Sequence, residues 1–271
     1  MELFPNRTIE FTLAIPLSGC VVKCLKYCPQ EVIMKRYTSK VRSFSMDTFR
    51  TVLSHTPNNI GVIIAGATEP YINRLCTDMM KEVLRQGRHL KFYSTLWGAT
   101  DNDIDELVRL DREYKGKVIV QIHLPDGVVM KEPPTLNYPE HFFKLQTNLS
   151  NILLMSMKGA FKSNDRENTA RGRNLHYRRY GHCDRANLCL SPFILPNGDT
   201  YLCCYDFGLR HKVGNILTDR YETLANYCLE REGKFELCRC CSENKPYLRR
   251  HFWRSIQRFR EVINPRDQNF L

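Results

Sequence analysis

The sequence predicts an α/β fold in which a partial (β/α)6 TIM-like barrel is followed by a small cysteine-rich extension made of a β-hairpin and a helix. In the first half, near-continuous apolar runs alternate with segments of helical periodicity, which is typical of a parallel sheet covered on both faces. After residue 180 the pattern changes to short strands and clustered cysteines. We therefore expect a barrel domain at residues 1–180 and an extension at 181–271.

The expected elements of the first half follow from hydrophobic periodicity. Strands are expected at 9–16, 60–65, 90–96, 118–123 and 152–157, and helices at 46–54, 71–85, 102–114 and 139–149. Ser45 is the expected N-cap of the helix at 46–54, and Asp101 that of the helix at 102–114. In such folds the chemistry lies at the carboxyl ends of the strands.

The second half predicts a hairpin and a helix. Strands at 193–196 and 200–204 flank Asn197-Gly198, a pair that suits a tight two-residue turn. Residues 247–263 carry apolar side chains at helical spacing, which predicts an amphipathic helix.

Charge and hydropathy restrict the setting of the protein. The formal net charge is +11, and much of the excess lies in 171–185 and 245–260. A solvated basic face explains this charge, and an acidic peptide, a phosphorylated small molecule or nucleic acid are alternatives, although no nucleic-acid motif accompanies it. Leu17-Ser18-Gly19-Cys20 matches a lipoprotein cleavage box, but the preceding apolar run is short and contains Pro16. We expect a cytoplasmic protein with no membrane span.

The cysteines point to metal ligation. Twelve cysteines form one group at the N-terminus and another after residue 180, with only Cys76 between them, and Cys76 is expected to be a buried small hydrophobe. In a long α/β chain, clustered thiols are more often metal ligands than disulfides. Cys20, Cys24 and Cys28 follow the first strand, and three thiolates would leave one iron of a [4Fe–4S] cluster open for a cofactor. Zinc and unligated thiols are the alternatives.

The same residues resemble the radical S-adenosylmethionine (SAM) superfamily. Cys20-x3-Cys24 and the aromatic Tyr27 just before Cys28 follow a strand, although the family spacing has one residue fewer before the third cysteine. The segment 66–70, Gly-Ala-Thr-Glu-Pro, is similar to the Gly-Gly-Glu-Pro loop with which the family contacts the amino group of SAM. The resemblance implies that Tyr27, Gly66 and Glu69 bind the cofactor. Ala-Thr replaces the usual double glycine.

The second cysteine group resembles the SPASM or shorter twitch extension of these enzymes. This resemblance implies one auxiliary [4Fe–4S] cluster, with ligands Cys183, Cys203, Cys238 and Cys241. Cys189 is an alternative to Cys183. Zinc is a rival here as well, because four cysteines with a two-residue loop suit a tetrahedral site.

The resemblance also implies a function. Such an enzyme reductively cleaves SAM to a 5′-deoxyadenosyl radical and oxidises or modifies a peptide or small molecule, with electrons from a flavodoxin- or ferredoxin-like donor. The alternative is a non-catalytic basic zinc or iron–sulfur protein that docks nucleic acid or a protein partner. Gln121 and His123 are expected to be satisfied polar core residues, with a ribose contact as the alternative, and are not included in the predicted site.

Overall fold

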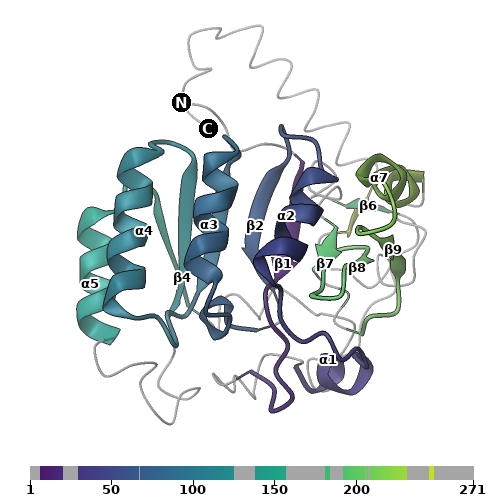
Figure 1. The fold of residues 1–271 in the computed structure, drawn as a ribbon, viewed down its shortest axis with the longest axis horizontal. Coiled ribbons are helices and arrows are strands. Elements are labelled where there is room, and N and C mark those ends of the chain that lie inside the picture. Colours follow the sequence, from purple (N-terminus) through teal and green to yellow (C-terminus); the bar gives the residue numbers. More distant parts are fainter. Residues whose placement is uncertain are drawn as a thin grey trace, which may run out of the picture.

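The structure is a computed structural model that describes residues 7–20, 30–66, 68–124, 138–156, 181–183, 192–204, 206, 208–230 and 244–246. An eight-stranded sheet lies at its centre, in the order β5-β4-β3-β2-β1-β7-β8-β9 (Figure 1). Five strands follow the chain in order and pair in parallel: β1 (Thr8–Thr12), β2 (Gly61–Ala65), β3 (Leu90–Ser94), β4 (Val118–Leu124) and β5 (Ile152–Ser156). The edge strands β5 and β9 do not pair, so the sheet stays open, and the expected α/β partial-barrel class is confirmed.

The sixth parallel strand comes from the second half of the chain. β7 (Phe193–Ile194) pairs with β1 and not with β5, and β8 (Asp199–Tyr201) and β9 (Lys212–Asn215) extend the sheet in antiparallel fashion. Residues 193–215 therefore continue the same sheet as the first half. A separate antiparallel pair joins β6 (Gly181–Cys183) to β10 (Asn244–Pro246).

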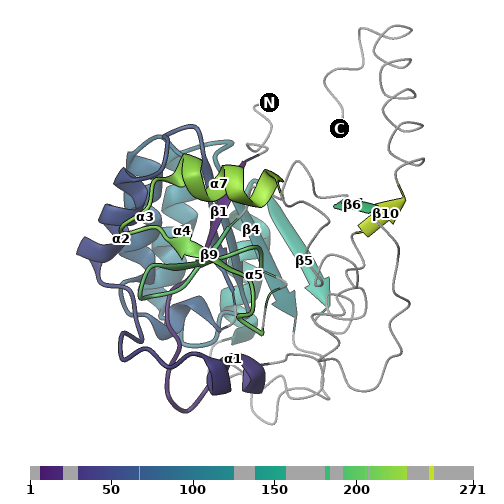
Figure 2. The ribbon, with the colours of Figure 1, turned by 90° about the vertical axis from the view of Figure 1, so that its right-hand side faces the viewer.

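Helices cover one face of the sheet. The layer consists of α2 (Met46–Ser54), α3 (Cys76–Arg85), α4 (Asp101–Glu113) and α5 (Tyr138–Asn148), and Figure 2 shows it on the side opposite to β6 and β10. The short helix α1 (Gln30–Arg36) lies at the end to which the parallel strands point, and α7 (Tyr221–Glu230) contacts β9.

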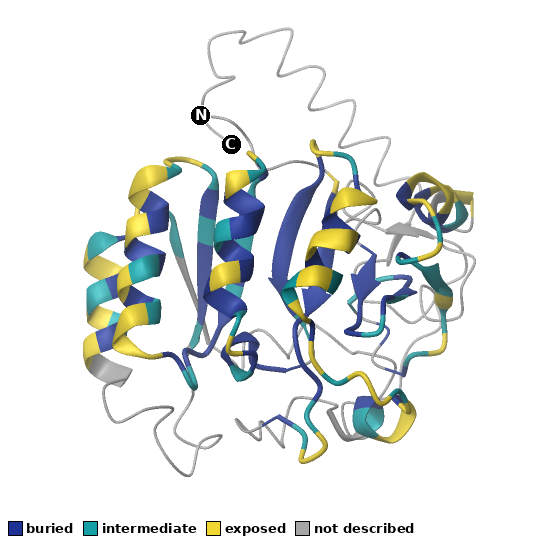
Figure 3. Ribbon diagram, viewed as in Figure 1, coloured by how far each residue is buried: buried dark blue, intermediate teal, exposed yellow. Residues whose placement is uncertain are grey.

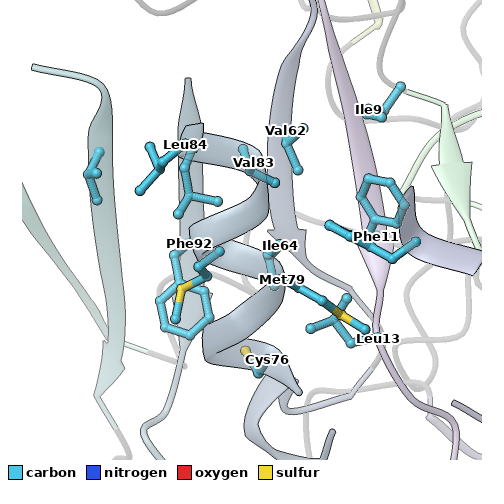
Figure 4. Close-up of a cluster of buried hydrophobic side chains, with 14 of the residues drawn as sticks. Ile9, Phe11, Leu13, Val62, Ile64, Cys76, Met79, Val83, Leu84 and Phe92 are labelled. Atoms are coloured by element: carbon cyan, nitrogen blue, oxygen red, sulfur yellow. The ribbon is translucent and has the colours of Figure 1, made fainter. Parts of the chain in front are cut away.

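The core lies between this layer and the sheet. The central strands are buried while the helices alternate buried and exposed residues (Figure 3). Figure 4 shows apolar side chains of α3, among them Cys76, Met79 and Val83, beside those of the strands, among them Ile64 of β2 and Phe92 of β3. Cys76 is 1% exposed, so its expected role as a buried hydrophobe is confirmed.

A buried arginine fastens the end of α2 to the sheet. The guanidinium of Arg88 is 1% exposed and donates to the backbone carbonyls of Leu53, Thr56, Pro57 and Ile60 at 2.7–3.3 Å, and to the side-chain oxygens of Asn58 and Gln86 at 3.0 Å. The carbonyls lie at the end of α2 and in the segment that joins it to β2, and those of Leu53 and Pro57 also accept from the backbone N–H groups of Thr56 and Ile60.

Several expected boundaries need correction. The N-cap of α4 is Thr100 and not Asp101, because Thr100 and Asp103 form a reciprocal capping box. The helix expected at 71–85 begins only at Cys76, after a separate 3-10 turn, η1 (Pro70–Ile72), since the Asn73 side chain bonds elsewhere. The Ser45 cap of α2 is confirmed.

The hairpin is present, but its turn is longer than expected. Gly198 N–H donates to the Leu195 carbonyl at 2.8 Å, and Gly198 has φ +80°. The loop therefore has three residues, Pro196 to Gly198, and ends in a left-handed glycine, a common hairpin geometry. The helices α1 and α7 were not expected, and the helix expected at 247–263 lies outside the described residues.

Candidate functional site

Two predicted site loops meet at the carboxyl end of the parallel strands. One follows β1 and leads from Leu13 to Cys20, and the other follows β2 and contains Gly66, Thr68 and Glu69. The hydroxyl of Thr68 donates to the backbone carbonyl of Ala14, which joins the two loops directly. Thr68 stands where the family loop has a glycine, so this departure from the family pattern has a structural role.

A buried asparagine adds to this junction. The amide nitrogen of Asn73 donates to the carbonyls of Leu13 at 3.2 Å and Phe44 at 3.0 Å, and its oxygen accepts from Leu75 N–H. Asn73 is 4% exposed. These bonds hold the loop after β2 against the segments after β1 and before α2.

Glu69 is a buried carboxylate held by the end of the next strand. It is 4% exposed, one oxygen accepts from the Ser94 hydroxyl, and the other accepts from the Thr95 N–H at 2.8 Å and the Thr95 hydroxyl at 2.7 Å. Ser94 and Thr95 were not predicted as site residues. The rule that chemistry lies at strand ends would have found them, since Ser94 is the last residue of β3.

The charge of Glu69 has no cationic partner among the described residues. Burial raises the pKa of Glu69 above its ordinary value, while hydrogen bonds from Ser94, Thr95 and the Tyr71 backbone act in the opposite direction. A buried anion with only neutral donors is costly unless a cation approaches it. The residues present therefore fit a ligand that carries an ammonium group, as SAM does.

Gly66 is required by a close approach to β1. It has φ +103°, and a Cβ there would lie 2.0 Å from Oγ1 of Thr12, closer than atoms can come. The first glycine of the predicted cofactor loop thus allows β1 and β2 to remain paired where the loop begins.

Only part of the predicted cysteine site is described. Cys20 is 7% exposed and ends the described stretch after β1, next to the turn that Gly19 N–H closes on the Pro16 carbonyl at 3.0 Å. Cys24, Tyr27 and Cys28 lie outside the described residues. Within the described part of the chain, no three His, Cys, Asp or Glu side chains form a metal-binding group.

The predicted auxiliary ligands are likewise described only in part. Cys203 packs beside Leu202 and Cys228, and its neighbour Cys204 packs against a second small core under α1. Cys183 ends β6, directly opposite Asn244 of β10. Cys189, Cys238 and Cys241 lie outside the described residues.

Polar side chains also lie on the sheet face away from the helix layer. Alternate residues Leu90, Phe92, Val120 and Ile122 belong to the core, so Lys91, Tyr93, Gln121 and His123 face the other way. The Nε2 atoms of Gln121 and His123 lie 2.8 Å apart, and the ring centroids of Tyr93 and His123 are 5.8 Å apart. Gln121 is 6% exposed and His123 is half-buried. The expectation of bonded polar residues is confirmed for this pair.

The comparison with solved structures supports the fold. No family model matches the sequence, and no curated protein matches it either. Among solved structures, BtrN in complex with AdoMet and 2-DOIA matches with a TM-score of 0.61 and 14% identity, over 88% of this chain and 92% of that chain. The structure of anSMEcpe with bound AdoMet matches with a TM-score of 0.55 and 10% identity, over 96% and 97%.

Both neighbours are radical SAM enzymes. The chain therefore has the fold of radical SAM enzymes over nearly its whole length, which confirms at the level of fold the resemblance inferred from the cysteine and Glu-Pro motifs. In the described part of the chain, no helix combines the length and hydropathy needed to cross a bilayer.

Proposed function

We propose that the protein is a radical SAM enzyme that reductively cleaves SAM and uses the resulting 5′-deoxyadenosyl radical to oxidise or modify a peptide or small molecule. One observation carries this proposal. At the carboxyl edge of the sheet, Thr68 joins the loop that bears the buried, uncompensated Glu69 to the loop that leads to Cys20. The loop that bears Glu69 and the loop that leads to the first of the three cysteines therefore lie together at one edge of a fold that such enzymes share.

The donor set fits an iron–sulfur cluster beside SAM. Cys20, Cys24 and Cys28 would supply three thiolates, which would leave one iron of the cluster open for SAM. When bound, the cluster supplies the electron that breaks the bond between the SAM sulfur and C5′, which leaves methionine and the radical. The protein binds and orients SAM and excludes water.

Within this proposal, Glu69 orients the methionine end of SAM through its ammonium group. Ser94 and Thr95 hold the carboxylate in place, so the charge is positioned before the ligand arrives. Gly66 lets the backbone of the same loop follow β1 closely. Tyr27 would lie beside the third thiolate.

The proposal extends to one auxiliary [4Fe–4S] cluster held by Cys183, Cys203, Cys238 and Cys241. The β6–β10 pairing supports Cys183 over Cys189, because it sets Cys183 opposite Asn244, three residues after Cys241. Three residues of chain reach about 11 Å, so Cys241 stays within that distance of Asn244.

The test is anaerobic reconstitution followed by product analysis. We expect about eight irons per chain for two [4Fe–4S] clusters, and release of 5′-deoxyadenosine from SAM with dithionite. Cys24→Ala should abolish cleavage, whereas Cys241→Ala should retain some cleavage without product formation. Stoichiometric zinc with no cleavage of SAM would refute the proposal. Equal loss of cleavage in both variants would refute the division of roles between the two clusters.

A further inference from the structure

A basic surface with two exposed apolar side chains lies beside the loop that leads to Cys20. The segment 30–46, which begins with α1, contains four basic residues, Lys35, Arg36, Lys40 and Arg42, and one acidic residue, Glu31. Lys35, Arg36 and Lys40 are exposed, at the end of α1 and in the segment that follows it (Figure 3). We call these residues, together with Leu17 and Val41, the α1 surface.

Two exposed apolar side chains belong to the α1 surface. Leu17 is 80% exposed and Val41 is 49% exposed, and they are two of three large hydrophobic side chains that lie exposed in the described ranges. Exposed apolar groups surrounded by charge are characteristic of protein–protein contact sites.

Backbone hydrogen bonds bring these residues together beside the predicted site. Ile15 N–H donates to the Arg42 carbonyl at 2.7 Å, and Ala14 and Ser43 form an antiparallel bridge. Leu17 and Val41 therefore belong to adjacent chain segments. Cys20 follows Leu17 by three residues, so the α1 surface borders the loop that would carry the first thiolate.

The positive charge of this surface is not neutralised by carboxylates in the structure as described. Arg36 donates to the Gly208 carbonyl at 2.6 Å, and the Arg42 guanidinium lies 5.1 Å from the Tyr37 ring centroid; both partners are neutral. Neither Lys35 nor Lys40 forms an ion pair with any described residue. The field of the surface is thus available to an acidic partner.

We propose that the α1 surface is where a small acidic electron-transfer protein of the flavodoxin type docks. This inference rests on the proposed function, which requires one electron per cleavage. The electron would leave the reduced donor, which becomes oxidised by one electron, and would pass to the iron–sulfur cluster that Cys20, Cys24 and Cys28 would hold. Encounters of this kind are small and weak, and charge complementarity mainly raises their association rate.

The test compares two charge reversals in the reconstituted protein. Lys35→Glu with Lys40→Glu reverses two charges of the α1 surface. Arg112→Glu with Lys115→Glu is the matched control, because each pair has one residue in the last turn of a helix and one in the loop beyond it. The control pair lies at the opposite end of the sheet, before β4.

Two readouts separate docking from catalysis. The first is binding of an oxidised acidic flavodoxin, measured by calorimetry at about 20 and about 200 mM salt. We expect the α1 variant to bind about tenfold or more weaker at low salt and to lose the salt dependence that wild type and control retain. The second is SAM cleavage, which in the α1 variant should fall with flavodoxin as donor and stay within about twofold of wild type with dithionite.

Each failure has a distinct meaning. Absence of dithionite-driven cleavage in the wild-type protein would refute the proposed function. Unchanged flavodoxin binding in the α1 variant, or equal loss of cleavage with both reductants, would overturn the docking proposal. The α1 variant could instead lose binding to a single-stranded DNA oligonucleotide while its flavodoxin-driven rate of SAM cleavage stays unchanged. This result would overturn the docking proposal and indicate that the α1 surface binds nucleic acid.

Discussion

Replacement of Glu69 by glutamine separates the role of the charge from the role of the shape. The amide oxygen of Glu69→Gln can still accept from Thr95, and its NH2 group can donate to the Ser94 hydroxyl oxygen. The variant therefore keeps the loop geometry and removes the buried charge. We expect it to fold.

The pH dependence of stability follows from the raised pKa of Glu69. An acid whose pKa is raised by folding stabilises the protein below its unfolded pKa of about 4.3, and this contribution is lost as the pH rises through the folded pKa. Glutamine does not titrate. The free energy of unfolding of Glu69→Gln should therefore rise relative to that of the wild type as the pH rises above the unfolded pKa of glutamate, by at most about 1.4 kcal/mol per pH unit.

SAM binding should change in the opposite direction. A hydrogen bond to a charged group contributes about 1.5–3 kcal/mol, so loss of the charge should weaken SAM binding to the reconstituted protein about 10- to 150-fold. Urea denaturation across the pH range and calorimetric titration with SAM measure the two effects.

Glu106→Gln is the control with the opposite sign. Hydrogen bonds from Arg109 and Lys81 lower the pKa of Glu106 to about 2. The ionised Glu106 carboxylate stabilises the protein above the unfolded pKa, and this stabilisation is lost as the pH falls. At neutral pH, Glu106→Gln should therefore have a lower free energy of unfolding than the wild type. If Glu69→Gln behaved like Glu106→Gln, the reasoning from burial would be wrong. If it bound SAM as tightly as the wild type, the carboxylate would serve only to tie the loops together.

Three further predictions concern the same framework. Gly66→Ala should lower the unfolding free energy by several kcal/mol in urea denaturation. Gly116→Ala is the control, because Gly116 has φ +81° and nothing within 4 Å of its Cβ position, and it should cost only about 1 kcal/mol of backbone strain. Equal effects of the two substitutions would disprove the contact with Thr12. Arg88→Met should cost at least about 3 kcal/mol, because it removes several hydrogen bonds that a charged group donates to carbonyls, and a loss below 1 kcal/mol by the same measurement would contradict this. Thr68→Val should lower the free energy of unfolding by about 1–3 kcal/mol and weaken SAM binding in calorimetry. Thr68→Ser keeps the hydroxyl and should retain both the stability and the SAM affinity. Equal behaviour of the two variants would show that the hydrogen bond to Ala14 is unimportant.

The sequence determined the pattern of the first half of the fold. Apolar runs such as 60–65 predict strands of a parallel sheet that are buried on both faces, and every residue of β2 is buried, although the described helices α2 to α5 cover only one face of the sheet. Local chemistry also fixed the Ser45 cap and the hairpin at Gly198, because both depend on residues close together in sequence. The cysteine and Glu-Pro motifs were identified for the same reason.

Tertiary structure decided the features that depend on distant residues. Nothing in the short strand β7 indicates that it pairs with β1, since that register joins Phe193 to Glu10 across most of the chain. Likewise, Glu69 is held by Ser94 and Thr95 from the next strand, about 25 residues away, and Thr68 by Ala14, 54 residues away. Spacing along the chain identifies which groups can do chemistry, but their hydrogen-bond partners and burial, which set their charge and position, arise only when the strand ends meet.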